Sequence, residues 1–167
     1  MKMLRYQVSG LVGAPIGSRM VLSLDEGPGD LGDQVQVDYL KGEIELVRSD
    51  CRLLASGVIS TQIRIPCARC LEPVLFPMSF EFEEAFHLSP VDIPGEAFYA
   101  VTHDGYLFLT APLREHILLN TPLRVLCRPG CRGLCPECGH NLNEGKCECI
   151  NEPDPRWTVL PSAQLFK

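Results

Sequence analysis

The sequence lacks the long apolar runs of a membrane protein. No stretch approaches the ~20 consecutive apolar residues that cross a bilayer as a helix. An apolar run at 8–16 follows Lys2 and Arg5, but Gly and Pro interrupt it and it contains no long aliphatic segment of the signal-peptide type. We therefore expect a cytoplasmic protein without a secretory signal or a membrane contact.

Positive charge is also scarce. The 167 residues include 15 Lys and Arg against 21 Asp and Glu, a net charge of −6. A protein that holds nucleic acid through bulk charge has the opposite balance, so nucleic-acid contact is expected only from a local patch or through a protein partner. No Lys or Arg occurs in 72–104. The sign reverses locally at three arginines among the cysteines, Arg124, Arg128 and Arg132.

Catalytic signatures are missing as well. The sequence shows no paired-carboxylate pattern, no phosphate-binding glycine-rich loop and no nucleophile–base motif. Its four histidines are scattered. These absences predict a protein that is not an enzyme, with no catalytic residues and no small-molecule substrate.

What the sequence does contain is a strand-rich centre. Its residues are 46% hydrophobic, enough for a core. Alternation with a period of two and β-branched residues predict an antiparallel meander. The expected strands are 34–40, 42–48, 53–65 and 73–86. Pro77 indicates an edge strand or a bulge. The glycine-rich residues 1–33 predict an N-terminal arm, or short elements joined by turns, ending in a linker. An acidic connection is expected at 88–104.

One helix is predicted at 111–120. Pro112 suits a first helical turn, and Pro122 ends the segment. Leu113 and Ile117 share one face at helical spacing, and two further leucines, Leu118 and Leu119, are expected to widen it, so the helix should be largely buried. The expected fold class is α+β. Its parts are an N-terminal arm and linker (1–33), an antiparallel β body with the helix (34–122) and a Cys-rich zinc-binding segment (123–167).

Nine cysteines are the strongest signal. An odd number without an export signal argues for metal ligation over disulfides. Cys135-x2-Cys138-Gly139 has the form of a zinc knuckle, since two such thiolates face one metal and a small following residue lets backbone amides point at sulfur. Cys147 and Cys149 complete a four-cysteine set, unless one of that pair serves elsewhere.

The remaining cysteines suggest a second site. Cys67 and Cys70 together with Cys127 and Cys131 form another set of four thiolates, which would tie a strand end to the segment after the helix. The alternatives are free thiols or a redox-active Cys67–Cys70 pair. Cys51 has no partner by spacing and is expected to be buried. Four thiolates close each site, which predicts structural rather than catalytic Zn²⁺, with one ion expected and two allowed by the cysteine count.

The motifs resemble those of the YceD family of large ribosomal RNA subunit accumulation proteins. Three patterns carry the central and C-terminal resemblance: Cys67-x-Arg69-Cys70-Leu71-x-Pro73; Leu113-Arg114-Glu115-x2-Leu118-Leu119; and Cys131-x-Gly133-Leu134-Cys135-Pro136-x-Cys138-Gly139-x-Asn141-Leu142-Asn143, followed by Cys147-x-Cys149 and Asp154-Pro155-Arg156-Trp157. A looser N-terminal pattern is Val8-Ser9-x-Leu11-Val12-x2-Pro15-x-Gly17-Ser18.

The resemblance implies a non-enzymatic role in the accumulation or processing of large-subunit rRNA. The implied partners are that rRNA or a pre-ribosomal particle, or else a ribosomal protein. The candidate nucleic-acid contacts are the arginines beside the cysteines, Arg69, Arg124, Arg128 and Arg132. The alternative role of these arginines is to offset the negative charge of a zinc–tetrathiolate site. The alternative function is a zinc–thiol redox-regulated or chaperone-like protein.

Overall fold

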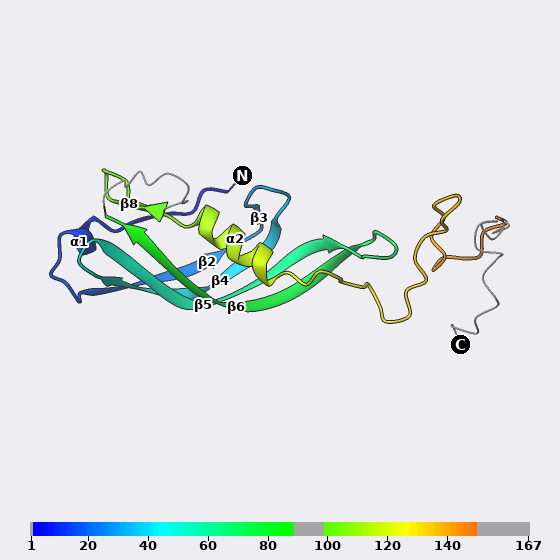
Figure 1. Ribbon diagram of the computed structural model, residues 1–167, viewed down its shortest axis with the longest axis horizontal. Coiled ribbons are helices and arrows are strands. Elements are labelled where there is room, and N and C mark those ends of the chain that lie inside the picture. Colours follow the sequence, from blue (N-terminus) through cyan, green and yellow to red (C-terminus); the bar gives the residue numbers. More distant parts are fainter. Residues whose placement is uncertain (1, 89–98, 150–167) are drawn as a thin grey trace, which may run out of the picture.

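The computed structural model describes residues 2–88 and 99–149 (Figure 1). Within these ranges the elements are β1 (Arg5–Gln7), α1 (Ser9–Val12), β2 (Arg19–Glu26), β3 (Gly29–Asp30), β4 (Gln36–Arg48), β5 (Arg52–Pro66), β6 (Pro73–His87), β7 (Tyr99–Ala100), β8 (Tyr106–Phe108) and α2 (Thr110–Asn120). Most of the acidic connection expected at 88–104 lies outside the described residues. Its described residues, 88 and 99–104, include β7 and the turn that leads to β8.

The body is one twisted sheet in the order β2-β4-β5-β6-β7, with β3 also pairing with β4. All of its pairings are antiparallel except β6 with β7. β5 and β6 pair along their whole length, from Arg52 opposite His87 to Pro66 opposite Pro73. The expected α+β class with an antiparallel β-rich body is confirmed. Pro77 lies where β6 has a partner strand on one side only, because β7 pairs with β6 at Phe86 and His87 alone. This agrees with the edge strand that Pro77 indicated.

The two strands expected at 34–40 and 42–48 are a single strand, β4, so this boundary was wrong. Gly42, the first residue of the second expected strand, lies inside β4, where its role is to allow close approach between strands. A Cβ on Gly42 would collide with the Val58 carbonyl oxygen of β5, and a Cβ on Gly57 of β5 would collide with the Glu43 carbonyl oxygen. Glycine inside a strand often marks a site where another backbone approaches closely.

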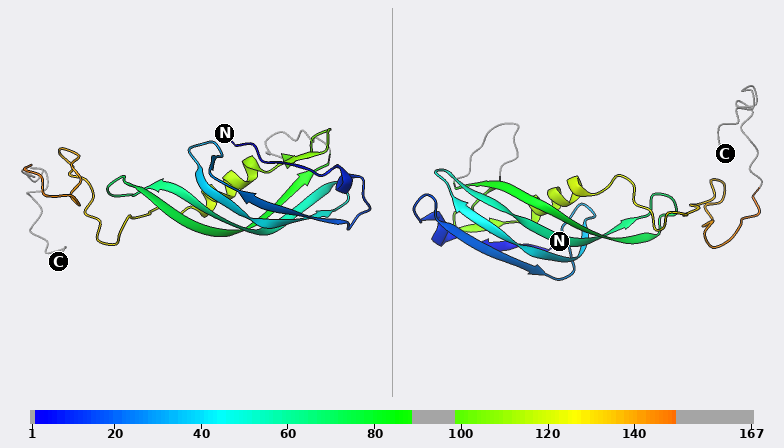
Figure 2. Two further views of the ribbon diagram at one scale, coloured as in Figure 1. Left: turned by 180° about the vertical axis from the view of Figure 1, so that it is seen from behind. Right: turned by 90° about the horizontal axis from the view of Figure 1, so that it is seen from below.

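The core lies between one face of this sheet and the segments that cross it. Phe82 and Phe86 of β6 and the side chains of α2 that face them, Leu113 and Ile117, are fully buried. Figures 1 and 2 show α2 lying across this face. The helix matches the expected range, but it is only half buried: Leu118 and Leu119 are 48% and 82% exposed. A single helix over a sheet buries one stripe, so the wider apolar face was a wrong expectation.

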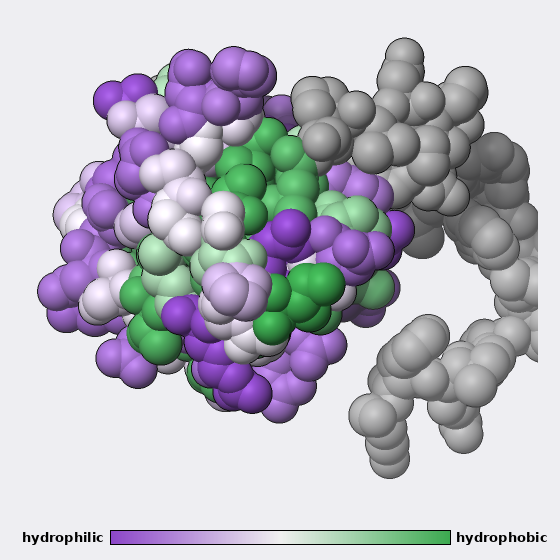
Figure 3. All heavy atoms as spheres, turned by 90° about the vertical axis from the view of Figure 1, so that its left-hand side faces the viewer, coloured by the Kyte–Doolittle hydropathy of each residue, from purple (hydrophilic) through white to green (hydrophobic). Residues whose placement is uncertain are grey.

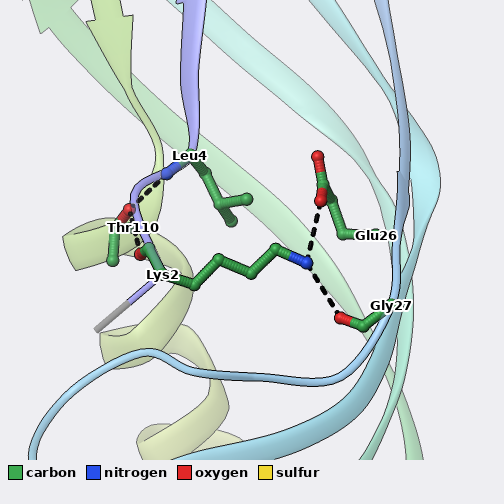
Figure 4. Close-up of polar contacts among 5 residues, drawn as sticks. All are labelled: Lys2, Leu4, Glu26, Gly27 and Thr110. Atoms are coloured by element: carbon green, nitrogen blue, oxygen red, sulfur yellow. Dashed lines mark hydrogen bonds and ion pairs between the residues drawn. The ribbon is translucent and has the colours of Figure 1, made fainter.

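Residues 2–30 contain short elements joined by turns, the second of the two interpretations offered for 1–33. β2 pairs with β4 over eight positions and β1 pairs with β8, so these residues are hydrogen-bonded to the body. Figure 4 shows the contact that holds the start of the chain. The buried Thr110 hydroxyl at the start of α2 accepts a hydrogen bond from Leu4 N at 2.8 Å and donates to Lys2 O at 3.2 Å, while Lys2 Nζ lies 2.8 Å from Glu26.

The cysteine-rich segment begins after α2. It runs alongside the far end of the β5–β6 hairpin and continues beyond it, away from the end of the body that carries α1 (Figures 1 and 2). That opposite end shows apolar surface between polar patches (Figure 3); Ile16, in the turn after α1, is 68% exposed. None of the helices in the described residues is long and apolar enough to span a membrane.

Candidate metal centres

The structure brings eight of the nine cysteines into two clusters of four. One contains Cys67, Cys70, Cys127 and Cys131, and the other contains Cys135, Cys138, Cys147 and Cys149. In each cluster the four sulfur atoms lie within 4.8 Å of one another. These are the two sets that the spacing suggested, with Cys147 and Cys149 in the same cluster. We call them the hairpin cluster and the C-terminal cluster.

The hairpin cluster joins two parts of the chain that are far apart in sequence. Its first two cysteines lie in the loop between β5 and β6, which Cys67 N closes by donating to Glu72 O at 2.8 Å. The segment after α2 is held against this loop by the hydrogen bond from Ala68 N to Val125 O, also 2.8 Å. The cluster therefore fixes the start of the cysteine-rich segment to the tip of the longest hairpin.

Two turns with the same backbone geometry present a pair of cysteines each. In the first, Leu71 N donates to Cys67 O at 3.0 Å, and in the second Gly139 N donates to Cys135 O at 2.9 Å. The residue after the second cysteine is left-handed in both, with φ of 62° at Leu71 and 72° at Gly139. This conformation costs an L-residue about 1–2 kcal/mol, so glycine suits it and Leu71 occupies it against its own preference.

Backbone N–H groups point at sulfur in both turns. Those of Cys70, Arg69 and Cys127 lower the pKa of Cys67 to about 6, and those of Cys138 and Glu137 lower the pKa of Cys135 to about 7. Each cluster also holds a thiol that resists ionisation. Desolvation and the Cys70 thiol raise the pKa of Cys127 to about 12, and hydrogen bonding with Cys138 raises that of Cys149 to about 12. Each cluster thus combines a thiol that ionises easily with one that does not. A bound divalent cation would let all four exist as thiolates, because a coordinated thiol loses its proton.

The donor set and its spacing fit a tetrahedral thiolate site. A Zn–S bond of ~2.3 Å with tetrahedral angles places sulfur atoms ~3.8 Å apart. Cys67 Sγ and Cys131 Sγ are 3.8 Å apart, and Cys70 Sγ and Cys127 Sγ are 3.6 Å apart. These separations are those of the hairpin cluster; in the C-terminal cluster the four sulfur atoms also lie within 4.8 Å of one another. Both clusters are able to hold a metal ion and are compatible with zinc, and four thiolates leave no open coordination position of the kind a catalytic metal uses.

The four candidate arginines are exposed, and they differ in what holds them. Arg69 Nη1 donates to Cys131 O at 2.8 Å, and Arg128 Nη2 donates to Asn143 Oδ1 at 2.8 Å. Within the described residues, the side chains of Arg124 and Arg132 make no hydrogen bond, and none of the four arginines is in an ion pair with Asp or Glu. Arg69 and Arg128 thus support the chain around the hairpin cluster, while Arg124 and Arg132 are free to meet an anion.

Asn143 contacts the hairpin cluster although the cysteine spacing did not identify it. Its Nδ2 lies 3.4 Å from Cys131 Sγ, and this hydrogen bond is the main cause that lowers the pKa of Cys131. His140, close in sequence to Cys138, belongs to neither cluster; its carbonyl oxygen accepts a hydrogen bond from Cys135 N. Cys51 is exposed in the turn between β4 and β5, so its expected burial was wrong.

Comparison with known proteins adds a family. The family model described as "Large ribosomal RNA subunit accumulation protein YceD" matches residues 55–162, from near the start of β5 through both clusters. An uncharacterized protein of Mycobacterium tuberculosis is 30% identical over 116 residues, covering 65% of this chain and 54% of that protein. Proteins named large ribosomal RNA subunit accumulation protein YCED homolog 1, chloroplastic, are 27% identical in Zea mays (74% of this chain, 52% of that protein) and 23% identical in Arabidopsis thaliana (89% and 53%).

The chain spans about half the length of these curated relatives. No solved structure matches it significantly.

Proposed function

Because the chain belongs to the YceD family of large ribosomal RNA subunit accumulation proteins, we propose that it is a non-enzymatic ribosome-biogenesis factor. It supports the accumulation or processing of large-subunit rRNA by binding that rRNA or an assembly intermediate in the cytoplasm, either directly or through a ribosomal protein. The family name supports the role in rRNA accumulation.

Zn²⁺ is the cofactor in this proposal, with one ion in each cluster. The sulfur separations of 3.6 and 3.8 Å and the two turns that aim N–H groups at sulfur support a preformed tetrathiolate site. Zinc would supply folding free energy to a segment with little core of its own. Around the hairpin cluster the buried hydrophobic group consists of Cys67, Cys70 and Cys131, with Val74, Leu126 and Leu134 packed against it.

The observation that carries the proposed RNA contact is the way the hairpin cluster holds an arginine-bearing segment. Arg124 precedes Cys127, and Arg132 follows Cys131, so the metal ligands fix the backbone on which both side chains stand. Neither guanidinium is occupied by a partner in the described residues, and both are exposed. A rigid backbone with free arginines suits phosphate contacts, which position a protein on RNA and act locally despite a net charge of −6.

The experiment is sucrose-gradient sedimentation of cell lysate, with each fraction probed for this protein and the profile repeated after its depletion. Co-migration with large-subunit precursors and a fall in mature large-subunit rRNA on depletion are expected. Replacing Arg124 and Arg132 together by Gln, with Arg128 kept because it supports the chain around the hairpin cluster, should shift the protein toward the top of the gradient and flatten the salt dependence of its association. A matched control replaces two exposed arginines of the sheet, Arg52 and Arg64, by Gln. Equal behaviour of both variants would remove the cysteine-flanking arginines from the proposal.

One observation favours a second candidate, a zinc–thiol redox-regulated or chaperone-like protein. Cys127, Cys138 and Cys149 are exposed, so peroxide can reach ligands of both clusters. Under the ribosomal proposal the reduced, zinc-loaded protein keeps its zinc in mild peroxide. Stoichiometric zinc release with disulfide formation, measured by a chromophoric chelator and mass spectrometry, would favour the redox function instead.

A further inference from the structure

The two clusters are separate metal sites, but the chain that carries one folds back onto the other. Only Arg132, Gly133 and Leu134 separate Cys131 of the hairpin cluster from Cys135 of the C-terminal cluster. The loop between Cys138 and Cys147 returns to this connection. Leu134 and Asn141 form an antiparallel bridge, and Leu142 N donates to Gly133 O at 2.9 Å. A loop whose two ends are ligands of one cluster is thus packed beside a ligand of the other.

Asn143 makes the contact between them. Its Nδ2 donates to Cys131 Sγ at 3.4 Å, and its Oδ1 accepts from Arg132 N at 2.9 Å and from Arg128 Nη2 at 2.8 Å. These three partners lie within residues 128–132, which include the fourth ligand of the hairpin cluster and begin directly after the third. A carboxamide is required, because the sulfur needs a donor while the two N–H groups need an acceptor.

A second asparagine sets the orientation of Asn143. Asn141 Oδ1 accepts from Asn143 Nδ2 at 2.8 Å and from Asn143 N at 3.1 Å. These bonds hold the amide with its nitrogen toward the sulfur, and Asn141 itself is tied to Leu134 by the bridge. The donor aimed at the hairpin cluster is therefore positioned by a loop that the C-terminal cluster closes.

We infer that Asn143 is a positioning residue that couples the two metal sites, so that metal in the C-terminal cluster strengthens metal binding at the hairpin cluster. Closing the loop at Cys138 and Cys147 orders Asn143 before the hairpin cluster is filled, and a donor already in place stabilises the Cys131 thiolate that the metal needs. Coupling between binding sites is reciprocal, so metal at the hairpin cluster strengthens the C-terminal site by the same factor. This inference rests on the zinc binding proposed above.

The magnitude follows from the kind of contact. Loss of a hydrogen-bonding partner of a metal ligand typically lowers metal affinity about 10- to 100-fold. Asn143 reaches one of the four thiolates of the hairpin cluster and does so at 3.4 Å, so a coupling factor of about tenfold, at the lower end of this range, is expected.

The test is a zinc titration of the full-length, reduced chain against a chromophoric chelator. The product of the two binding constants in the intact chain is compared with the product of the constants from two single-site variants, Cys147→Ser with Cys149→Ser and Cys67→Ser with Cys70→Ser. About a tenfold excess in the intact chain is expected. Asn143→Ala should remove the excess while two zinc ions still bind. Asn120→Ala is the matched control, because that amide donates to His116 O on the exposed side of α2 and should leave the excess intact.

The outcomes separate this inference from the proposal beneath it. A chain that binds no zinc would overturn both. Two zinc ions bound with no excess, or with an excess that Asn143→Ala leaves unchanged, would overturn the coupling alone and leave the zinc sites in place. Circular dichroism of the zinc-loaded Asn143→Ala protein, unchanged in the sheet region, shows that a lost excess does not come from an unfolded body.

Discussion

Replacing Thr110 by Val tests whether the N-terminal residues belong to the folding unit of the body. Thr110 is 5% exposed at the start of α2, and its hydroxyl serves two backbone groups of residues 2–4 (Figure 4). Val has nearly the same shape, so the change removes the hydrogen bonds and leaves the packing volume. Leu4, whose N–H loses its acceptor, is itself only 3% exposed, so water cannot easily replace the hydroxyl.

The expected cost is set by that buried N–H. Leaving a buried donor without a partner costs about 1–3 kcal/mol, whereas exchange of an exposed hydrogen bond for one to water costs little. We expect Thr110→Val to lower the free energy of unfolding by about 2 kcal/mol, which for a chain of this size lowers Tm by about 4–8 °C.

Thr102 offers a matched control. Its hydroxyl also joins an N–H and a carbonyl, accepting from Tyr106 N at 3.0 Å and donating to Tyr106 O at 3.2 Å, but the residue is exposed. Thr102→Val should therefore change the unfolding free energy by less than about 0.5 kcal/mol. Urea unfolding of the zinc-loaded proteins, followed by circular dichroism, measures both. Equal effects of the two substitutions would refute the argument, because burial is the one respect in which the two sites are meant to differ.

Two further predictions concern the clusters. Removing zinc with a chelator should expose the amides of 126–149 to hydrogen exchange while those of β4, β5 and β6 stay protected. The reason is that the hydrophobic group at the hairpin cluster is built mainly on buried cysteines, whereas the sheet has its own core. Mass spectrometry locates the exchange, and loss of protection throughout the sheet would contradict this prediction. The second prediction concerns pH in the zinc-free chain. Hydrogen bonds from backbone N–H groups lower the pKa of Cys67 from 9.0 to about 6, so they stabilise the hairpin loop fully above pH 9 and lose their effect as the pH falls through about 6. Hydrogen exchange of the loop amides, corrected for its intrinsic pH dependence, should show less protection at pH 5 than at pH 8.

The pattern of alternating residues was enough to predict most of the sheet, because a strand with one buried face leaves a period of two in the sequence. It wrongly divided β4 between residues 40 and 42, although Gly42 lies inside a continuous strand and makes a close contact with β5. It also could not show that β2 belongs to the sheet. Glycines and prolines surround this strand, and its pairing with β4 depends on the tertiary structure. The half-buried helix is a similar case, since the width of its covered face depends on the sheet beneath it.

The cysteine sets were easier to predict than the residue that joins them, and the reason is chemical. A thiolate pair around one metal must approach to within about 4 Å, so short sequence spacings constrain the partners strongly, and two turns of the same geometry satisfy that constraint here. Asn143 is under no such constraint in sequence. It reaches Cys131 across 12 residues because Asn141 and Leu134 bring the loop back. An asparagine in a turn is usually there for the turn itself. What separates Asn143 from Asn141 is the direction of one amide: that of Asn141 stays within its own loop, bonding to Asn143 and Glu144, whereas that of Asn143 leaves the loop for a sulfur of the other site.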